Sequence, residues 1–400
     1  MKVCFVTNLP VWSLAEGGGA PSFFNTIKMF VDRGHSVTLL TTETNHELRD
    51  LKPLRIVNIP CRKSTEKRSF GGLFRLLQKH LNYVMSQDDI IPYLEEHANN
   101  ADLLYAYEIG FVPGVVDYAR KKQIPCVSRF QGTILTDLVQ ETSVLRKLRL
   151  YTQFYDHIQA MRAVPDITVM TDDGTKGDQV LRCLRRNDSS KIHFFKNGVD
   201  LPMPDITREK YNRLHSGNDI VFCSVSRLQR WKRVDRSIEI FSRFKARFSN
   251  SYYYIVGDGP EKEALEKIVR QKGLHDSVTF LGIQNKSQIY SLLKDTKYFL
   301  SSYELSNLGN PLFEAMACGA VVVTLNNGAT SEMVIDGVTG IISDESEYVS
   351  NVIRLIDCEN DPEVVMMMRD AAKNHLVASL ESWDQRMERE YNVLELFLRR

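Results

Sequence analysis

The 400-residue sequence contains no apolar run of the roughly 20 residues that a membrane-spanning helix needs. Its opening segment, MKVCFVTNLP, is too short and becomes too polar by residue 8 for a secretory signal peptide. These absences predict a cytoplasmic protein, with a peripheral position at the inner face of the membrane as a further option. The length suits two domains better than one.

Metal and nucleic-acid signatures are also missing. None of the seven cysteines lies at CxxC spacing, and the nine histidines form no HExxH or HxH cluster, so no zinc motif is present. An odd number of scattered cysteines favours buried free thiols in a reducing compartment. The formal net charge is only +1, so bulk charge does not attract nucleic acid, and we expect no nucleic-acid partner.

The sequence does contain a regular alternation of short apolar runs with helix-length segments. The runs begin at Val3–Thr7, continue to His193–Phe195, and start again at Ile220–Val225 after a polar stretch at 201–219. One longer helical region covers about 73–99. This pattern predicts an α/β fold, with parallel sheets covered by helices on both faces.

The polar stretch divides the chain into two parts with the same pattern. We expect two Rossmann-like, doubly wound domains over residues 1–203 and 204–380, followed by a helix over 381–400. Two such domains facing each other form a cleft at the carboxyl ends of both sheets, where open α/β sheets bind ligands.

Two cations lie in the loop that follows the strand Ile220–Val225. Arg227 and Lys232 are five residues apart in SRLQRWK. Long cationic side chains at the carboxyl end of a strand can converge on one anion. A departing diphosphate needs this, because its negative charge grows as a glycosyl bond breaks. The plainer alternative is a solvated basic turn, since Arg230 and Arg233 are basic too.

A second loop, Asn307–Asn310, runs into a helix. We expect Asn310 to be the N-cap and Pro311 the first helical residue. The amides at this helix start would hold phosphate, and Gly309 lets the backbone approach a ligand. Glu314, one turn further, could accept hydrogen bonds from both ribose hydroxyls. The alternative is an ordinary capped helix.

Glycines mark two further loops. Gly257 and Gly259 follow the strand Tyr252–Val256, and they either belong to a structural turn or shape the floor of a nucleotide pocket. Gly17–Gly19 follow the first strand without GxGxxG spacing, which disfavours a nicotinamide enzyme, and would make room for a phosphate or sugar. Asn197–Asp200 alone indicates a turn.

Basic and apolar residues alternate in two N-terminal stretches. In the first, at 62–79, cations surround Phe70, Leu73, Phe74 and Leu77. The second mixes apolar with basic residues: Val144, Leu145, Arg146, Lys147, Leu148, Arg149 and Leu150. Each stretch is either a solvated helix face or a segment that rests on an anionic membrane surface.

Together, these segments resemble the retaining glycosyltransferases of family 4, which have the GT-B fold. The matching pieces are the GGG loop at 17–19, NGVD at 197–200, SRLQRWK at 226–232, IVGDGPE at 255–261, VTFLG at 278–282 and PLFEAMACGAVVV at 311–323. The match extends to residue 340 and covers most of the C-terminal domain and the ends of the N-terminal one. It implies two domains facing across a cleft, with the helix near Trp383 crossing back onto the N-terminal domain.

The resemblance implies roles for the matching positions. Arg227 and Lys232 would bind the donor diphosphate and Glu314 the ribose, and these three are the expected catalytic residues. Backbone amides at 308–310 would bind the diphosphate, and the backbone at 280–282 would meet the base. The positions expected to contact the donor are Gly18, Gly19, Gly257, Phe280, Leu281, Gly282, Glu304, Ser306, Asn307, Leu308, Gly309 and Asn310.

The sequence departs from the family pattern in two places. The family usually has a second carboxylate eight residues before the ribose-binding one, where this chain has Ser306, with Glu304 two residues further back. The family also often has His-Gly after the strand Cys126–Phe130, where this chain has Gln131 and Gly132. These two residues are expected on the acceptor or sugar side of the cleft. Neither departure removes the phosphate site.

The resemblance therefore predicts a retaining hexosyltransferase of polysaccharide or cell-envelope synthesis. Its donor would be a UDP- or GDP-sugar, which is a co-substrate, and its acceptor a saccharide or lipid-linked saccharide bound by the N-terminal domain. No cofactor or metal is expected, because Arg227 and Lys232 supply positive charge. The alternatives are an inactive relative that binds nucleotide-sugars in a regulatory role, and another GT-B enzyme such as an epimerase or phosphorylase.

Overall fold

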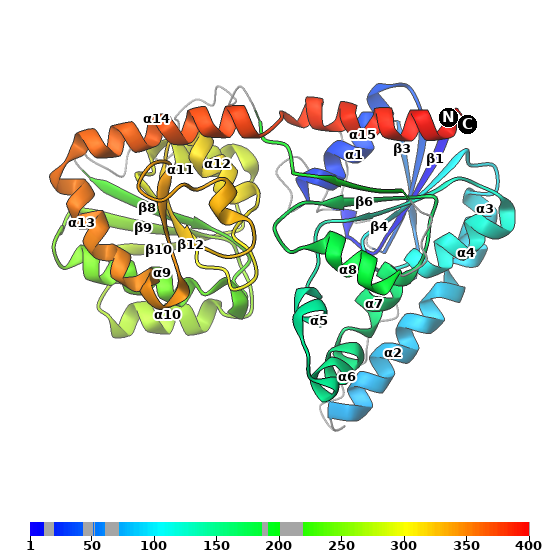
Figure 1. The fold of residues 1–400 in the computed structure, drawn as a ribbon, viewed down its shortest axis with the longest axis horizontal. Coiled ribbons are helices and arrows are strands. Elements are labelled where there is room, and N and C mark those ends of the chain that lie inside the picture. Colours follow the sequence, from blue (N-terminus) through cyan, green and yellow to red (C-terminus); the bar gives the residue numbers. More distant parts are fainter. Residues whose placement is uncertain are drawn as a thin grey trace. The chain divides into compact units, whose positions relative to one another are not determined.

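The computed structural model describes residues 1–11, 20–42, 51, 53–60, 72–185, 191–200 and 219–399, with the backbone alone at 72–75. The chain divides into two compact units (Figure 1). Unit 1 comprises Met1–Lys196 and Arg386–Arg400, and unit 2 comprises Asn197–Gln385. The boundary expected at 203/204 falls on residues outside the described ranges. Helices cover both faces of the sheet in each unit (Figure 1).

Unit 1 is built on a parallel sheet that has, in the described ranges, seven strands in the order β3-β2-β1-β4-β5-β6-β7. The strands are β1 (Lys2–Thr7), β2 (Ser36–Thr41), β3 (Leu54–Asn58), β4 (Leu103–Tyr107), β5 (Cys126–Phe130), β6 (Ile167–Thr171) and β7 (Lys191–Phe195). The helices are α1 (Pro21–Asp32), α2 (Gly72–Asp89), α3 (Ile91–His97), α4 (Val112–Lys122), α5 (Thr136–Gln140), α6 (Val144–Gln153), α7 (Tyr155–Arg162), α8 (Gly177–Leu184) and α15 (Trp383–Leu398), which belongs to this unit from Arg386 onward.

Unit 2 repeats this plan with a parallel sheet in the order β10-β9-β8-β11-β12-β13. The strands are β8 (Ile220–Val225), β9 (Ser251–Val256), β10 (Val278–Gly282), β11 (Tyr298–Leu300), β12 (Val321–Leu325) and β13 (Gly340–Ser343). The helices are α9 (Val234–Lys245), α10 (Lys262–Gln271), α11 (Lys286–Asp295), α12 (Asn310–Cys318), α13 (Val352–Asn360) and α14 (Pro362–Ser379), with short 3-10 turns η3 (Arg230–Lys232), η4 (Thr330–Glu332) and η5 (Glu345–Asn351).

The sheets are buried on both faces, which explains their continuous apolar runs. Every residue of β4, β6 and β8 is buried. Side chains of a strand alternate between faces, so Phe222 and Tyr298 enter one core of unit 2, while Cys223 and Phe299 enter the core on the other face. The α/β fold of two doubly wound sheets is thereby confirmed.

The helical region expected over about 73–99 consists of two helices. The first ends at Asp89, and the second begins at Ile91 with Pro92 in its first turn. Proline lacks an amide hydrogen and disfavours helical geometry in the preceding residue, so it starts a helix more readily than it continues one. No helix in the described ranges is both long and apolar enough to span a bilayer.

Polar residues of the last helix, α15, are buried inside unit 1. Glu390 forms an ion pair with Arg129 of β5 and another, at 2.8 Å, with Arg386. It also accepts a hydrogen bond from the Tyr105 hydroxyl at 2.5 Å. Burial opposes ionisation of Glu390, but the two guanidinium groups hold its pKa at about 2. These contacts fix the C-terminal helix to the sheet of unit 1.

Candidate functional site

The sheet of unit 2 has one point at which its strand order reverses. From β8 the chain proceeds outward to β9 and β10, and then returns to β11 on the other side of β8. Ligands of doubly wound sheets bind at this point, at the carboxyl ends of the strands. The loop at 226–233 follows β8, and the loop at 301–309 follows β11. Both segments expected to bind phosphate therefore leave the sheet at the same place.

The two cations of the first loop have different surroundings. Arg227 is exposed, and no carboxylate of a described residue lies within 4.0 Å of its guanidinium. The Nζ of Lys232 lies 3.4 Å from the centroid of the Tyr303 ring and 3.9 Å from that of the Trp231 ring. Aromatic faces attract a cation without cancelling its charge. Because Tyr303 belongs to the loop after β11, this contact joins the two loops.

Close backbone packing fixes the position of Arg227. The Leu228 amide donates a hydrogen bond to the carbonyl of Asp258 in the turn after β9, at 2.8 Å. Gly257 in the same turn has φ 122°, and a Cβ there would lie 1.9 Å from the Ser226 carbonyl oxygen. Only glycine allows this approach. Gly257 therefore supports the loop that carries Arg227, and its contribution to a nucleotide pocket stays a prediction.

Helix α12 begins one residue earlier than expected. Gly309 is its N-cap in an extended conformation, Asn310 is the first helical residue, and Pro311 lies in the first turn. Asn310 does not cap the helix, because its Oδ1 accepts a hydrogen bond from Asn197 Nδ2 at 3.0 Å. The first amides of a helix have no partner within it, and Pro311 has none to offer. The Asn310 amide thus lies foremost at the positive end of the helix dipole.

Several groups expected to contact the donor instead hold the loop before α12. Asn307 is buried, and its Oδ1 accepts hydrogen bonds from Ser301 Oγ at 2.6 Å and from the Tyr303 amide at 2.9 Å. The Leu308 amide donates to Ser306 Oγ at 3.2 Å. A buried loop must satisfy its own polar groups. The amides at the cap and first residue of α12 are the groups of this segment that remain suited to a phosphate.

Glu304 lies in the same loop and pairs with Arg233. The distance from Arg233 NH1 to Glu304 Oε1 is 3.1 Å, and a second pair joins Arg233 to Asp235 at 2.9 Å. Hydrogen bonds to Asp235 and then to Glu304 raise the pKa of Arg233. The sequence showed Arg233 only as one more basic residue of a turn. The described residues contain no group of three or more His, Cys, Asp or Glu placed to hold a metal ion.

Glu314 is nearly buried on α12, with 9% of its surface exposed. Burial raises the pKa of Glu314 to about 7, Asp200 adds to this rise, and Lys286 and a hydrogen bond with Tyr290 oppose it. Tyr290 and Lys286 both belong to α11, and both also contact Asp200, by a hydrogen bond and an ion pair. Only the ionised carboxylate can accept hydrogen bonds on both oxygens. The pKa of Glu314 therefore lies near neutral pH, and contact of this carboxyl with a ribose stays a prediction.

The segment Asn197–Asp200, which the sequence marked only as a turn, contacts both α12 and α11. Asn197 contacts Asn310, and Asp200 contacts residues of α11. A Cβ at Gly198 would lie 2.7 Å from the Cα of Trp383, so a glycine is needed where the segment passes the start of α15. A local pattern cannot reveal a partner 113 residues away.

The end of β10, where the base contact is expected, lies beside the turn after β9. The Gly257 amide donates to the Gly282 carbonyl at 2.8 Å, and Gln284 Nε2 donates to the Leu281 carbonyl at 2.7 Å. The pairing with β9 is irregular between Phe280 and Gly282. The structure thus brings Phe280, Leu281 and Gly282 next to Gly257, and contact of these residues with a base stays a prediction.

The expected residues of unit 1 lie at the end of β5. Gln131 Nε2 donates to the Tyr107 hydroxyl at 2.7 Å. A Cβ at Gly132 would lie 2.1 Å from Asp173 Oδ2, so Asp173 packs directly on this glycine. Burial raises the pKa of Asp173 to about 6. In the sequence, the only signal for Asp173 is its place after the apolar strand β6. Gly18–Gly19 lie outside the described residues.

Comparison with known proteins decides the family of unit 2. Residues 205–375 match the family "Glycosyl transferases group 1". Unit 2 is a group 1 glycosyl transferase domain. The resemblance seen in the sequence is thereby confirmed.

The relatives of this chain are distant in sequence. The N-acetyl-alpha-D-glucosaminyl L-malate synthase of Bacillus anthracis is 21% identical over 359 residues, which are 89% of this chain and 88% of that protein. The GDP-mannose-dependent alpha-(1-6)-phosphatidylinositol monomannoside mannosyltransferase of Mycolicibacterium smegmatis is 26% identical over 211 residues, 50% of this chain and 54% of that one.

A solved structure covers the whole chain. HepE from Anabaena, in complex with UDP-glucose, matches with a TM-score of 0.71 at 16% identity, over 99% of both chains. At this identity the likeness concerns the fold. Together with the two sheets described above, it confirms the predicted fold, GT-B with two Rossmann-like parallel-sheet domains.

Proposed function

We propose that this chain transfers a hexose or N-acetylhexosamine from a UDP- or GDP-sugar to a saccharide or lipid-linked acceptor, with retention of the anomeric configuration. One observation carries the proposal. The exposed Arg227 guanidinium, the Asn310 amide and the buried Glu314 carboxyl all belong to loops or helices that leave the switch point of one sheet. The first two groups suit a diphosphate, and the third suits a ribose.

The names of similar proteins support the donor class. They include an N-acetyl-alpha-D-glucosaminyl L-malate synthase, a GDP-mannose-dependent mannosyltransferase and a complex with UDP-glucose. Two of these names specify alpha products, which is the outcome that retention gives with alpha-linked donors. The names differ in base and sugar, so we propose a nucleotide-sugar donor without choosing between UDP and GDP.

The proposed transfer needs no protein nucleophile and no metal. The acceptor hydroxyl oxygen bonds to the anomeric carbon as the bond from that carbon to the donor phosphate oxygen breaks. The hydroxyl proton passes to an oxygen of the departing diphosphate. Arg227, Lys232 and the positive end of α12 stabilise the charge that grows there, the role that fixed cations and helix ends play elsewhere. Glu314 holds the ribose in place.

We also propose a lipid-linked acceptor and a peripheral position at the inner, anionic face of a membrane. Support comes from the mixed basic and apolar sequence of α6 in unit 1. The mannosyltransferase relative is named for a phosphatidylinositol-based acceptor. Anionic lipid surfaces attract clusters of Lys and Arg.

A second candidate is a relative that binds nucleotide-sugars without transfer. Specific observations favour it: Ser306 replaces a carboxylate, and the nearby Glu304 is engaged by Arg233. An epimerase is the weaker alternative, because no described carboxylate and histidine pair lies at the switch point.

The experiment that tests the proposal incubates the purified chain with UDP- and GDP-sugars, with and without a lipid extract, and measures free UDP or GDP. The proposal expects release that rises when the acceptor-containing extract is added. Donor binding without release under any condition would establish the second candidate instead. Release accompanied by an epimerised sugar, with no transfer to the extract, would favour the epimerase.

A further inference from the structure

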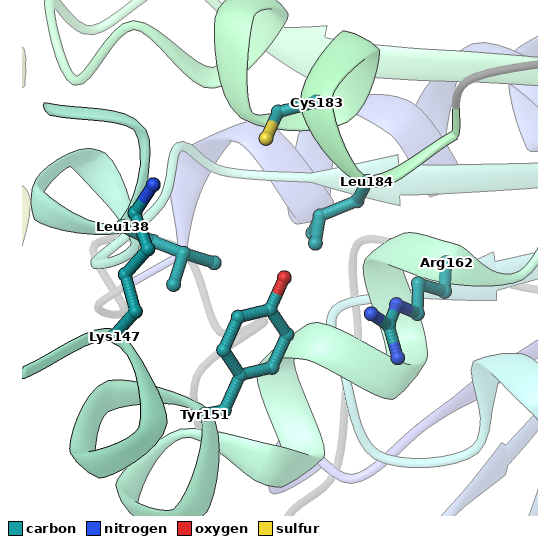
Figure 2. Close-up of a pocket in the computed structure, with 6 residues that line it drawn as sticks. All are labelled: Leu138, Lys147, Tyr151, Arg162, Cys183 and Leu184. Carbon is teal, nitrogen blue, oxygen red and sulfur yellow. The ribbon is translucent and has the colours of Figure 1, made fainter. Parts of the chain in front are cut away.

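Unit 1 contains a cavity of about 440 Å³ that lies apart from the residues assigned above. It is lined by Leu138 of α5, Lys147 and Tyr151 of α6, Arg162 of α7, and Cys183 and Leu184 of α8. Figure 2 shows Lys147 and Arg162 on opposite sides, with the Tyr151 hydroxyl directed between them. This volume falls in the range of about 300–1,000 Å³ that small-ligand sites occupy.

The charge of this cavity is one-sided. Its lining has two cations and no carboxylate, and no carboxylate of a described residue lies within 4.0 Å of Lys147 or Arg162. Arg162 instead lies 5.4 Å from the centroid of the Tyr151 ring. A neighbouring hollow of about 420 Å³ differs, because Asp137 and Glu141 line it together with two arginines. The cavity at Lys147 is therefore the one suited to an anion.

The surface beside this cavity is apolar and exposed. Val144 and Leu145 of α6 are each 79% exposed, and Leu148 is 60% exposed. At 3.6 residues per turn these three side chains span about a third of the helix circumference, next to Lys147 and Tyr151. We call them the α6 ridge. Exposed apolar residues gathered in this way are typical of a surface that contacts a membrane or another protein.

Helix α2 also exposes apolar side chains. It meets α6 near the end of that helix, where His80 of α2 contacts the Thr152 carbonyl at 2.6 Å. On α2 the exposed apolar side chains recur at helical spacing: Leu77, Leu81, Val84 and Met85. Both helices thus expose apolar residues, and those of α6 lie on the helix that also lines the positively charged cavity. An anionic phospholipid is complementary to such a surface, because its phosphate can pair with the cations and its acyl chains can contact the apolar side chains.

We infer that the Lys147–Arg162 cavity binds the headgroup phosphate of an anionic membrane phospholipid, while the α6 ridge enters the acyl boundary. The Tyr151 hydroxyl can donate a hydrogen bond to the same phosphate. Interfacial helices bind in this way, through apolar burial combined with attraction to anionic headgroups. The inference rests on the proposed membrane contact and adds a defined headgroup site to it.

The test compares binding to vesicles of phosphatidylcholine alone and of phosphatidylcholine with phosphatidylglycerol. The site variant is Lys147→Gln with Arg162→Gln, neither of which is a buried residue. The matched control, Arg120→Gln with Lys121→Gln, removes the same charge from exposed positions on α4. Lys147→Arg with Arg162→Lys keeps the charge. Glycerol 3-phosphate is titrated as a soluble headgroup probe.

We expect binding that requires phosphatidylglycerol. At about 1 kcal/mol for each cation near the surface, the site variant should lose on the order of 30-fold in affinity. The control should lose less than about threefold in affinity, because charge away from the membrane surface is screened. The charge-keeping variant should still bind, because both cations remain. Leu145→Ser with Leu148→Ser should weaken vesicle binding but leave any glycerol phosphate binding unchanged.

Three outcomes would overturn the inference. Equal losses in the site variant and the α4 control would mean that only overall charge matters. Glycerol phosphate binding without vesicle binding would assign the cavity to a soluble phosphate. Self-association that disappears in the Leu145→Ser, Leu148→Ser variant would make the ridge a contact between copies of the chain. Nucleotide release without vesicle binding would support the proposed glycosyl transfer and contradict the headgroup site. Vesicle binding without nucleotide release would support the headgroup site and contradict the proposed transfer.

Discussion

The affinity of the donor site should depend on pH through Glu314. Burial raises the pKa of this carboxyl to about 7. If the ribose hydroxyls need the ionised form, the binding-competent fraction is about 10% one pH unit below that value and about 90% one unit above it. Apparent affinity scales with the competent fraction, so the dissociation constant should fall about tenfold between pH 6 and pH 8.

Calorimetric titration of the best-binding nucleotide-sugar across this range measures the effect. A nucleotide-sugar is the right probe because its diphosphate diester does not titrate there, unlike free UDP or GDP. Glu314→Gln keeps the size of the side chain and removes its ionisation, so its affinity should not vary with pH. Equal pH slopes in the two proteins would refute the assignment of the ribose to Glu314, as would tighter binding by wild type at the acidic end.

Three further predictions concern the stability of unit 1, the turn at Gly257 and the need for a divalent metal. Glu390→Gln leaves Arg129 buried without its charged partner and should lower the free energy of unfolding by about 3–5 kcal/mol in denaturant titrations. The pKa of Glu390 is about 2 in the folded chain, below the unfolded value of about 4.3, so its contribution to stability should be complete above about pH 5 and lost as pH falls toward 2. A loss of stability on the alkaline side instead would contradict the pairing. Gly257→Ala places a methyl group against the Ser226 carbonyl and should weaken donor binding while far-ultraviolet circular dichroism stays unchanged, whereas wild-type affinity would show that the turn does not fix Arg227. Nucleotide release should survive chelation by EDTA, and loss of release that Mg²⁺ restores would show that Arg227 and Lys232 do not suffice.

Much of the fold followed from local patterns. The runs Val3–Thr7 and Ile220–Val225 coincide with β1 and β8 to within a residue, because strands buried on both faces must be apolar throughout. The break between α2 and α3 was available from Pro92 and was overlooked. The two segments expected to bind phosphate could be proposed from sequence because loops at strand ends carry glycine, proline and charge for reasons that are visible locally.

The remainder depended on contacts between distant residues. The sequence could not show that Glu304 pairs with Arg233, 71 residues away, or that the Asn307 side chain forms hydrogen bonds within its own loop. Nor could it show that Glu390 crosses 261 positions to neutralise Arg129. Tertiary packing selects these partners, and no periodicity records them. Asn307 and the Leu308 amide, both expected to contact the donor, form hydrogen bonds within their own loop for that reason.

The central claim is that Arg227 neutralises the donor diphosphate, and nucleotide release by two single variants tests it most directly. Arg227→Ala should lower the rate of release by about 10²–10³-fold, as loss of one preorganised charge-stabilising group does in other enzymes. Arg230→Ala, which removes an exposed cation from the same loop, should change the rate by less than about threefold. An undiminished rate in Arg227→Ala, or equal losses in the two variants, would contradict the account.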